Sequence, residues 1–250
     1  VTGHLERSGK HWNIMTIDGM VAPAKAITVR MSPDEGGRKF SVTSVDAGSV
    51  LKALDVTGNV VGGGLSVTGR YDDTAPRSPF KGTVEISNFR LERAPLLAKV
   101  LSVASLAGIL NALSGQGIDF SRFKASVTYV GGAIYTDDLL AHGSALGFTG
   151  KGSVDLKKQT IDLQGTVVPA YALNSLLGNI PLLGSILTGP QEGGGVFAAN
   201  YRMRGTLDNP DVTVNPLATL TPGILRNIFN IFDRPVPSAP PPANAPLQAP

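Results

Sequence analysis

The chain has 250 residues, of which 42% are hydrophobic, so it is long enough to bury a substantial core as one large domain or two smaller ones. Only 16% of the residues are charged, the net charge is +3 and aromatic residues make up 6%, which together disfavour a nucleic-acid-binding surface. The absence of cysteine excludes disulfide bonds, thiolate zinc sites and cysteine nucleophiles.

The N-terminal part of the chain predicts a series of β-strands. Apolar residues alternate with polar ones around Ile14 and Phe40, which is the period of two expected of strands with one buried face. Residues 46–55 predict a short helix, because the aspartate at its start can cap it. The three glycines at 62–64 lack the Lys-Ser or Lys-Thr ending of a phosphate-binding loop, so we predict a bend or bulge within a strand there.

Two later strands change their apolar phase half-way along. In residues 80–91 the apolar positions on either side of the change are Ile86 and Phe89, which stand three apart instead of two or four. Residues 118–130 show the same break after Phe120. A β-bulge would restore one continuous apolar face in each strand, and it would also bend the sheet. We therefore predict a curved sheet.

Residues 95–113 interrupt the strands with an apolar segment that predicts one helix. Apolar side chains cover most of the helix circumference, and the stretch is near the lower limit of length for crossing a bilayer. Two interpretations stay open: the helix plugs or caps an end of the sheet, or it enters or lies on a membrane. The second interpretation would bring into contact with lipid the side chains of Leu96, Leu97, Val100 and Leu101.

The strands after residue 118 alternate apolar and polar side chains, as in an antiparallel sheet that is wetted on one face only. We therefore predict a mainly β fold with a few helices, in which a curved antiparallel sheet forms an open hydrophobic groove, a half-pipe. The side chains expected to line this groove and to bind lipid are Val127, Tyr129, Ile161, Leu163, Val167, Phe197, Tyr201 and Met203.

The C-terminal part combines apolar helical segments with a Pro-rich tail. Residues 170–188 predict two short helical pieces, and residues 217–232 predict an amphipathic helix whose apolar face packs against the sheet or touches a membrane. Residues 235–250 are rich in Pro and Ala and predict a disordered tail behind one domain over residues 1–234. The membrane-contacting side chains of the amphipathic helix would be Ile224, Leu225, Ile228, Phe229 and Phe232.

No arrangement typical of catalysis or metal binding stands out in the sequence. Two pairs of adjacent carboxylates, Asp72-Asp73 and Asp137-Asp138, stand beside turn residues, where such pairs are usually solvated. We therefore expect no enzyme activity, no metal and no cofactor. The three histidines lack the spacing of metal ligands: His4, His11 and His142.

Four sequence blocks stand in a fixed order toward the C-terminus. They are Leu-Asn-Ser-Leu-Leu-Gly from Leu173, Ile-Pro-Leu-Leu-Gly from Ile180, Gly-Thr-Leu-Asp-Asn-Pro from Gly205 and Thr-Pro-Gly-Ile-Leu-Arg from Thr221. Together they resemble the C-terminal region of AsmA-like proteins, which are large envelope proteins of Gram-negative bacteria. The resemblance extends upstream to about Ala94, so it covers somewhat over half of the chain.

The resemblance implies a non-enzymatic module that binds and transfers phospholipid or another acyl lipid. Such a module would be part of a bridge-like conduit between inner and outer membranes, located in the periplasm, contacting a membrane surface such as the inner leaflet of the outer membrane and contributing to outer-membrane biogenesis. Because the chain opens at Val1 in strand-like sequence, we expect an upstream segment to supply targeting and an inner-membrane anchor. The alternative is a structural or assembly factor of the envelope that docks another envelope protein through its helical end.

Overall fold

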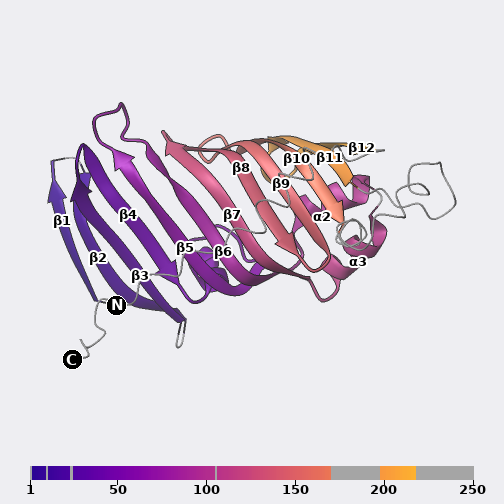
Figure 1. The fold of residues 1–250 in the computed structure, drawn as a ribbon, viewed down its shortest axis with the longest axis horizontal. Coiled ribbons are helices and arrows are strands. Elements are labelled where there is room, and N and C mark those ends of the chain that lie inside the picture. The colour runs from indigo at the N-terminus through magenta and orange to yellow at the C-terminus, as the bar shows by residue number, and fades with distance from the viewer. Residues whose placement is uncertain (1, 10, 23–24, 105, 170–197, 218–250) are drawn as a thin grey trace, which may run out of the picture. The chain divides into compact units, whose positions relative to one another are not determined.

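A computed structural model describes residues 2–9, 11–22, 25–104, 106–169 and 198–217 of the chain (Figure 1). All of them lie in one of its two compact units, Val1–Ala218. These residues form a single sheet of twelve strands, each paired antiparallel with the next one in chain order. The strands are β1 (Thr2–Ser8), β2 (His11–Ala22), β3 (Lys25–Asp34), β4 (Gly37–Ser44), β5 (Val60–Asp72), β6 (Phe80–Leu91), β7 (Ile118–Val130), β8 (Ala133–Gly143), β9 (Leu146–Asp155), β10 (Thr160–Pro169), β11 (Ala198–Thr206) and β12 (Asp211–Leu217).

The sheet is curved and unclosed, because β1 and β12 stand at opposite ends of the strand order and do not pair with each other. The prediction of a mainly β fold built on a curved antiparallel sheet is therefore confirmed. Alternation of apolar and polar residues along the strands gives the sheet one apolar and one polar face, since residues directly opposite each other on neighbouring strands point to the same side.

The phase change in β6 is real, but its cause is not the bulge expected from the sequence. Ile86 and Phe89 are both buried, and the register with β7 runs without a shift from Ser87 to Phe89. Asn88, at φ 51°, rotates the strand there without adding a residue. Asparagine tolerates this left-handed conformation better than most side chains do.

The glycine run in β5 lies opposite this rotated residue. Gly62 and Gly63 have φ of 68° and 87°, and a β-carbon on Gly63 would lie 2.7 Å from Cβ of Phe89. The predicted bend at residues 62–64 is confirmed, and glycine is required because the backbone is left-handed and the neighbouring strand is close. In β7 the predicted bulge is also confirmed, because the register with β8 shifts between Phe120 and Arg122.

Three short helices connect strands within the described residues: α1 (Ala47–Ala53), α2 (Pro95–Val103) and α3 (Ala107–Ser114). The carboxylate of Asp46 accepts a hydrogen bond from the amide of Ser49 at 3.0 Å, so α1 begins at its expected cap. The helix expected over 46–55 is therefore present in slightly shorter form.

The single helix expected over residues 95–113 is wrong, because the segment divides into α2 and α3. The amide of Leu106 donates to the carbonyl oxygen of Leu101 at 2.9 Å, which closes the end of α2 and turns the chain. The turn allows Leu101, Leu106 and Leu113, which lie on both helices and the connection, to be buried in one core. A straight helix would spread these side chains along its length.

The core lies between these helices and the apolar face of the sheet. Phe120 is at its centre, stacked on Phe89 with ring centroids 5.3 Å apart and edge-on to Phe148 at 5.8 Å. Val167 and Ala199, from strands much later in the chain, belong to the same buried cluster. The expected helices over 170–188 and 217–232 and the tail over 235–250 lie outside the described residues.

Candidate functional site

One row of directly opposed residues crosses the apolar face through all twelve strands; we call it the central row. Each neighbouring pair in it is joined by the strand register. Thr136 is its single polar side chain, and three of its members are glycine. In strand order the row is Leu5, Met15, Met31, Phe40, Gly69, Gly82, Val127, Thr136, Gly152, Leu163, Met203 and Val212.

Seven of the eight predicted groove residues share this face. Val127, Leu163 and Met203 belong to the central row itself, and the other four stand two or four positions from a row member on the same strand. Tyr129 is 40% exposed, whereas Val167 is fully buried. The other members are Ile161 and Tyr201, and Phe197 lies outside the described residues. Their contact with lipid stays a prediction.

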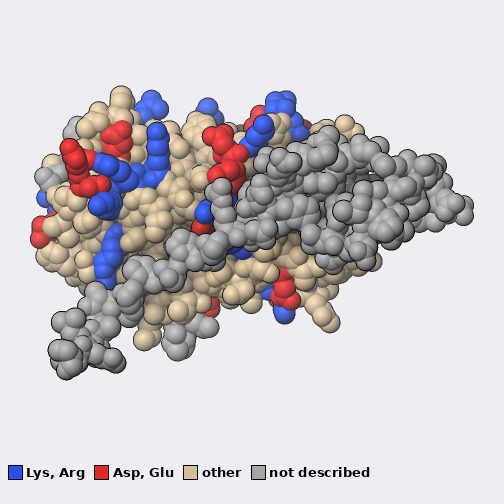
Figure 2. Space-filling view, in the orientation of Figure 1, with Lys and Arg blue, Asp and Glu red and all other residues tan. Residues whose placement is uncertain are grey.

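The opposite face is polar and carries paired charges. Lys124 lies 3.0 Å from the carboxylate of Glu85, and Asp162 lies 3.2 Å from both Arg202 and Arg204. The hydrogen bond from Arg204 lowers the pKa of the Asp162 carboxyl. Figure 2 shows Lys and Arg in the same clusters as Asp and Glu, so neither sign of charge dominates the visible surface.

A cavity of about 200 Å³ opens on the apolar face between β6 and β10. Side chains from the central row and from its neighbours line it, and they are almost all aliphatic or aromatic. The cavity lies where Gly152 removes side-chain volume from the row. Prominent in its lining are Val84, Phe123, Val127, Thr136, Leu139 and Leu163.

Tyr201 covers part of the same face in a way that depends on a glycine. Its hydroxyl donates to the carbonyl oxygen of Thr149 at 2.7 Å, and Gly165 stands between the two strands concerned. A β-carbon on Gly165 would lie 2.9 Å from that hydroxyl. Burial raises the pKa of the Tyr201 phenol, so the ring is an uncharged part of the wall. The sequence predicted Tyr201 in the groove but gave no signal for the role of Gly165.

Helices α2 and α3 pack against the apolar face at the end of the sheet formed by β9–β12 (Figure 1). The ammonium group of Lys99 donates to the carbonyl oxygen of Pro210 at 2.6 Å and to Asn209 at 3.0 Å. This fastens α2, which follows β6, to the turn before β12. Of the interpretations kept open for this segment, the one in which it caps an end of the sheet fits this packing.

The membrane-contact candidates differ in exposure. Val100 and Leu101 are buried in the core, whereas Leu96 and Leu97 are partly exposed. Contact of these residues with a membrane stays a prediction. The candidates Ile224, Leu225, Ile228, Phe229 and Phe232 lie outside the described residues.

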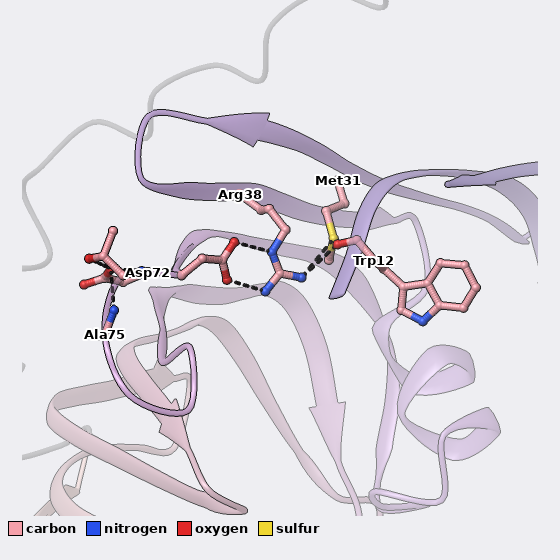
Figure 3. A network of polar contacts seen from close by, with 7 residues as sticks. Trp12, Met31, Arg38, Asp72 and Ala75 are labelled. Atoms are coloured by element: carbon pink, nitrogen blue, oxygen red, sulfur yellow. Dashed lines mark hydrogen bonds and ion pairs between the residues drawn. The ribbon is translucent and has the colours of Figure 1, made fainter. Parts of the chain in front are cut away.

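A buried ion pair stands on the apolar face in the N-terminal half of the sheet, at β4 and the end of β5. Arg38 is 6% exposed and donates through Nε and Nη2 to the carboxylate of Asp73, both at 2.8 Å. Its Nη1 donates to the carbonyl oxygen of Trp12 at 2.8 Å (Figure 3). The guanidinium also lies 4.5 Å from the ring centroid of Tyr71. Hydrogen bonding from Arg38 lowers the pKa of the Asp73 carboxyl.

The two carboxylate pairs differ from the expectation that they are merely solvated in turns. Asp73 is held by Arg38, while Asp72 accepts hydrogen bonds from the amides of Thr74 and Ala75. Asp138 lies within β8, not beside a turn, and its carboxylate accepts from Ser126 at 2.8 Å. Asp72 and Asp138 therefore bond to backbone amides, whereas Asp73 pairs with an arginine side chain.

Neither a cluster of possible metal ligands nor a helix able to span a membrane occurs in the part of the chain that the structure describes. There, no three His, Cys, Asp or Glu side chains gather closely enough to hold a metal ion. No helix within the same residues combines the length and the apolar character needed to cross a bilayer.

A curved antiparallel sheet with two unpaired edge strands and one largely apolar face defines the class: a mainly β protein built on a single open sheet. The model of the YhdP protein family matches residues 62–212. Because this match covers more than half of the sequence, the chain belongs to the YhdP protein family, and the resemblance to AsmA-like envelope proteins is confirmed.

The intermembrane phospholipid transporter YhdP of Escherichia coli (strain K12) is similar to this chain. The two are 27% identical in an alignment of 145 residues, which covers 52% of this chain and 11% of that protein. The matched region therefore spans a small part of the relative's length. No solved structure matches the chain significantly.

Proposed function

We propose that this chain is a non-enzymatic module that binds phospholipid or another acyl lipid on its apolar face and passes it along the groove. The observation that carries the proposal is the central row, which offers an apolar path across every strand from Leu5 to Val212. The family relationship supports it, because the similar protein from Escherichia coli is described as an intermembrane phospholipid transporter.

The physical basis is burial of acyl chains. Each methylene group removed from water contributes about 0.8 kcal/mol to the binding free energy. An acyl chain that lies on this face is therefore held strongly without any directional contact. Contacts of this kind are nearly equal at every position along the path, which favours sliding over tight capture. Charged side chains of the polar face keep the outside of the sheet in water.

The wider role is supported by the resemblance to AsmA-like envelope proteins and by the intermembrane transport named for the relative. We propose that the module belongs to a bridge-like conduit between inner and outer membranes, lies in the periplasm, is anchored to the inner membrane through an upstream segment and contributes to outer-membrane biogenesis. Contact with a membrane surface, such as the inner leaflet of the outer membrane, belongs to the same proposal.

A second candidate function rests on α2 and α3. These helices bury Val100, Leu101 and Leu113 against the sheet, so the chain fills part of its own apolar face. In that case the chain would be a structural or assembly factor of the envelope that docks another envelope protein through its helical end.

Extraction of lipid from the purified chain separates the two candidates. Mass spectrometry of the extract should find phospholipid in near-stoichiometric amount, and the loaded chain should transfer a fluorescent phospholipid between vesicles. A lipid-free protein that transfers nothing between vesicles would contradict lipid handling and favour the assembly factor.

A further inference from the structure

Strand β8 contains one residue more than either neighbour beside the cavity. Its register shifts between Thr136 and Leu139 against β9, and between Thr136 and Leu140 against β7. The extra length forms a bulge at the two aspartates, 137 and 138. The carboxylate of Asp138 accepts the amide and the hydroxyl of Ser126, both at 2.8 Å, and so replaces the interrupted strand hydrogen bonds.

The bulge decides which side chains face the cavity. Strict alternation after Thr136 would bring Asp138 onto the apolar face. With the bulge, Leu139 follows instead and lines the cavity, while Asp138 remains bonded on the polar side. A charged group is thus kept out, and Thr136 is left as the polar side chain of the central row.

The hydroxyl of Thr136 is buried and has no hydrogen-bond partner among the described residues. On one side its neighbour in the row is Val127, and on the other it is Gly152. A β-carbon on Gly152 would collide with the carbonyl oxygen of Asp162, so no larger residue fits there and no side chain covers the hydroxyl from that position. A buried hydroxyl without a partner is costly, and such groups in native proteins call for an explanation.

We propose that Thr136 donates a hydrogen bond to the ester carbonyl oxygen of a glycerophospholipid whose acyl chain occupies the cavity. This inference rests on the proposed lipid-binding function. The ester carbonyl is neutral and only accepts, which matches the hydroxyl as donor. A phosphate group does not fit this place, because no charged side chain among the described residues lines the cavity and an unpaired anion there would be strongly disfavoured.

The size of the cavity agrees with this assignment. At about 200 Å³ it is smaller than the roughly 300–1,000 Å³ of sites that enclose whole small molecules. It therefore takes the carbonyl end and the first methylene groups of one acyl chain, and the headgroup remains outside. Thr136 then makes one point of the otherwise uniform apolar path selective for lipids whose acyl chains are joined to glycerol by an ester bond.

The test compares ester-linked with ether-linked phosphatidylethanolamine, which have the same headgroup and chain length but differ in the carbonyl oxygens. The full chain is incubated with vesicles containing equal amounts of the two lipids, and the bound lipids are counted by mass spectrometry. Wild type is compared with Thr136→Val, which keeps the shape and removes the donor, and with Thr136→Ser, which keeps the donor. Thr128→Val, on the polar face of β7, is the matched control.

We expect wild type, Thr136→Ser and Thr128→Val to prefer the ester lipid by about 3- to 10-fold, the effect of one hydrogen bond, and Thr136→Val to bind both lipids equally. Equal binding of both lipids by wild type, or an unchanged preference in Thr136→Val, would overturn the assignment of Thr136 while leaving lipid binding intact. If wild type binds neither lipid, the proposed function fails together with this inference.

Discussion

The hydroxyl of Tyr201 on β11 reaches over β10 to the carbonyl oxygen of Thr149 on β9, at 2.7 Å. The ring can lie along the sheet because the intervening residue, Gly165, has no side chain. An aromatic ring that lies along the sheet adds apolar surface to the groove and projects into it less than an upright ring would. The same arrangement occurs at Phe80, whose ring lies over the opposed glycines Gly69 and Gly82.

Gly165→Ala should destabilise the protein by roughly 1–3 kcal/mol, the usual cost of forcing extra volume into a packed site. The new methyl group would collide with the carbonyl oxygen of Thr149 and press on the Tyr201 hydroxyl. Urea unfolding measures the change. Gly58→Ala is the control, because nothing lies within 4 Å of a β-carbon there; equal effects of the two substitutions would show that the glycine serves no close packing.

Tyr201→Phe should cost about 1 kcal/mol near pH 8, since it leaves a buried carbonyl oxygen unpaired. The difference from wild type should shrink as the pH rises above about 10, the ordinary pKa of tyrosine. Burial raises the pKa of Tyr201 in the folded protein, so the unfolded chain loses this proton first and wild-type stability falls with pH, whereas the variant has no such proton. Unfolding free energies at pH 8 and pH 11 test this; a difference that does not change with pH would contradict it.

Leu163→Glu and Gln164→Glu place the same carboxylate on opposite faces of β10. On the apolar face an unpaired charge costs several kcal/mol unless its pKa rises, so Leu163→Glu should lower both the stability and the amount of co-purified lipid. Gln164 pairs with Lys151 and Arg202 across the ladder, where a carboxylate meets positive charge. Gln164→Glu should therefore be nearly silent; comparable losses in both variants would refute the assignment of the faces.

Removing the guanidinium of Arg38 should be more harmful than removing the whole ion pair. Arg38→Leu leaves the Asp73 carboxylate without its partner, at a cost of about 3 kcal/mol, the low end for a buried pair because the Asp73 side chain is 27% exposed. The double variant Arg38→Leu with Asp73→Leu should recover part of that loss. A double variant less stable than Arg38→Leu would mean that the pair is not the source of the effect.

The sequence predicted the strands well where a local pattern determines them. Alternation alone identified β6 and β7 at their observed bounds, and the phase change between Ile86 and Phe89 correctly signalled an irregularity of the strand at Asn88. Strand β12 was not predicted, because it offers only Val212 and Val214 as apolar alternation and depends on pairing with β11. The division of residues 95–113 into two helices likewise depends on core contacts that no local period reports.

The polar groups on or beside the groove were hardest to predict. Asp73 binds an arginine 35 positions away in the sequence, and Asp138 binds a serine 12 positions away. Neither partner can be found from the neighbouring residues. The glycines at 152 and 165 give no local signal either, since their role is to leave space for an atom on another strand. The apolar residues of the candidate site could thus be predicted from the sequence. The polar groups and the close-packed glycines among them could not.

Each of the twelve described strands pairs only with its neighbours in the sequence. A hairpin added at a turn would therefore widen the sheet without changing the order of the other strands. The bond from Lys99 to Pro210 limits where this can happen. It joins the segment after β6 to the turn before β12, so it fixes the number of strands between those points. Evolution should therefore tolerate the gain or loss of strands between β1 and β6. Between β6 and β12, a change in the number of strands should require a change in the contact between Lys99 and Pro210.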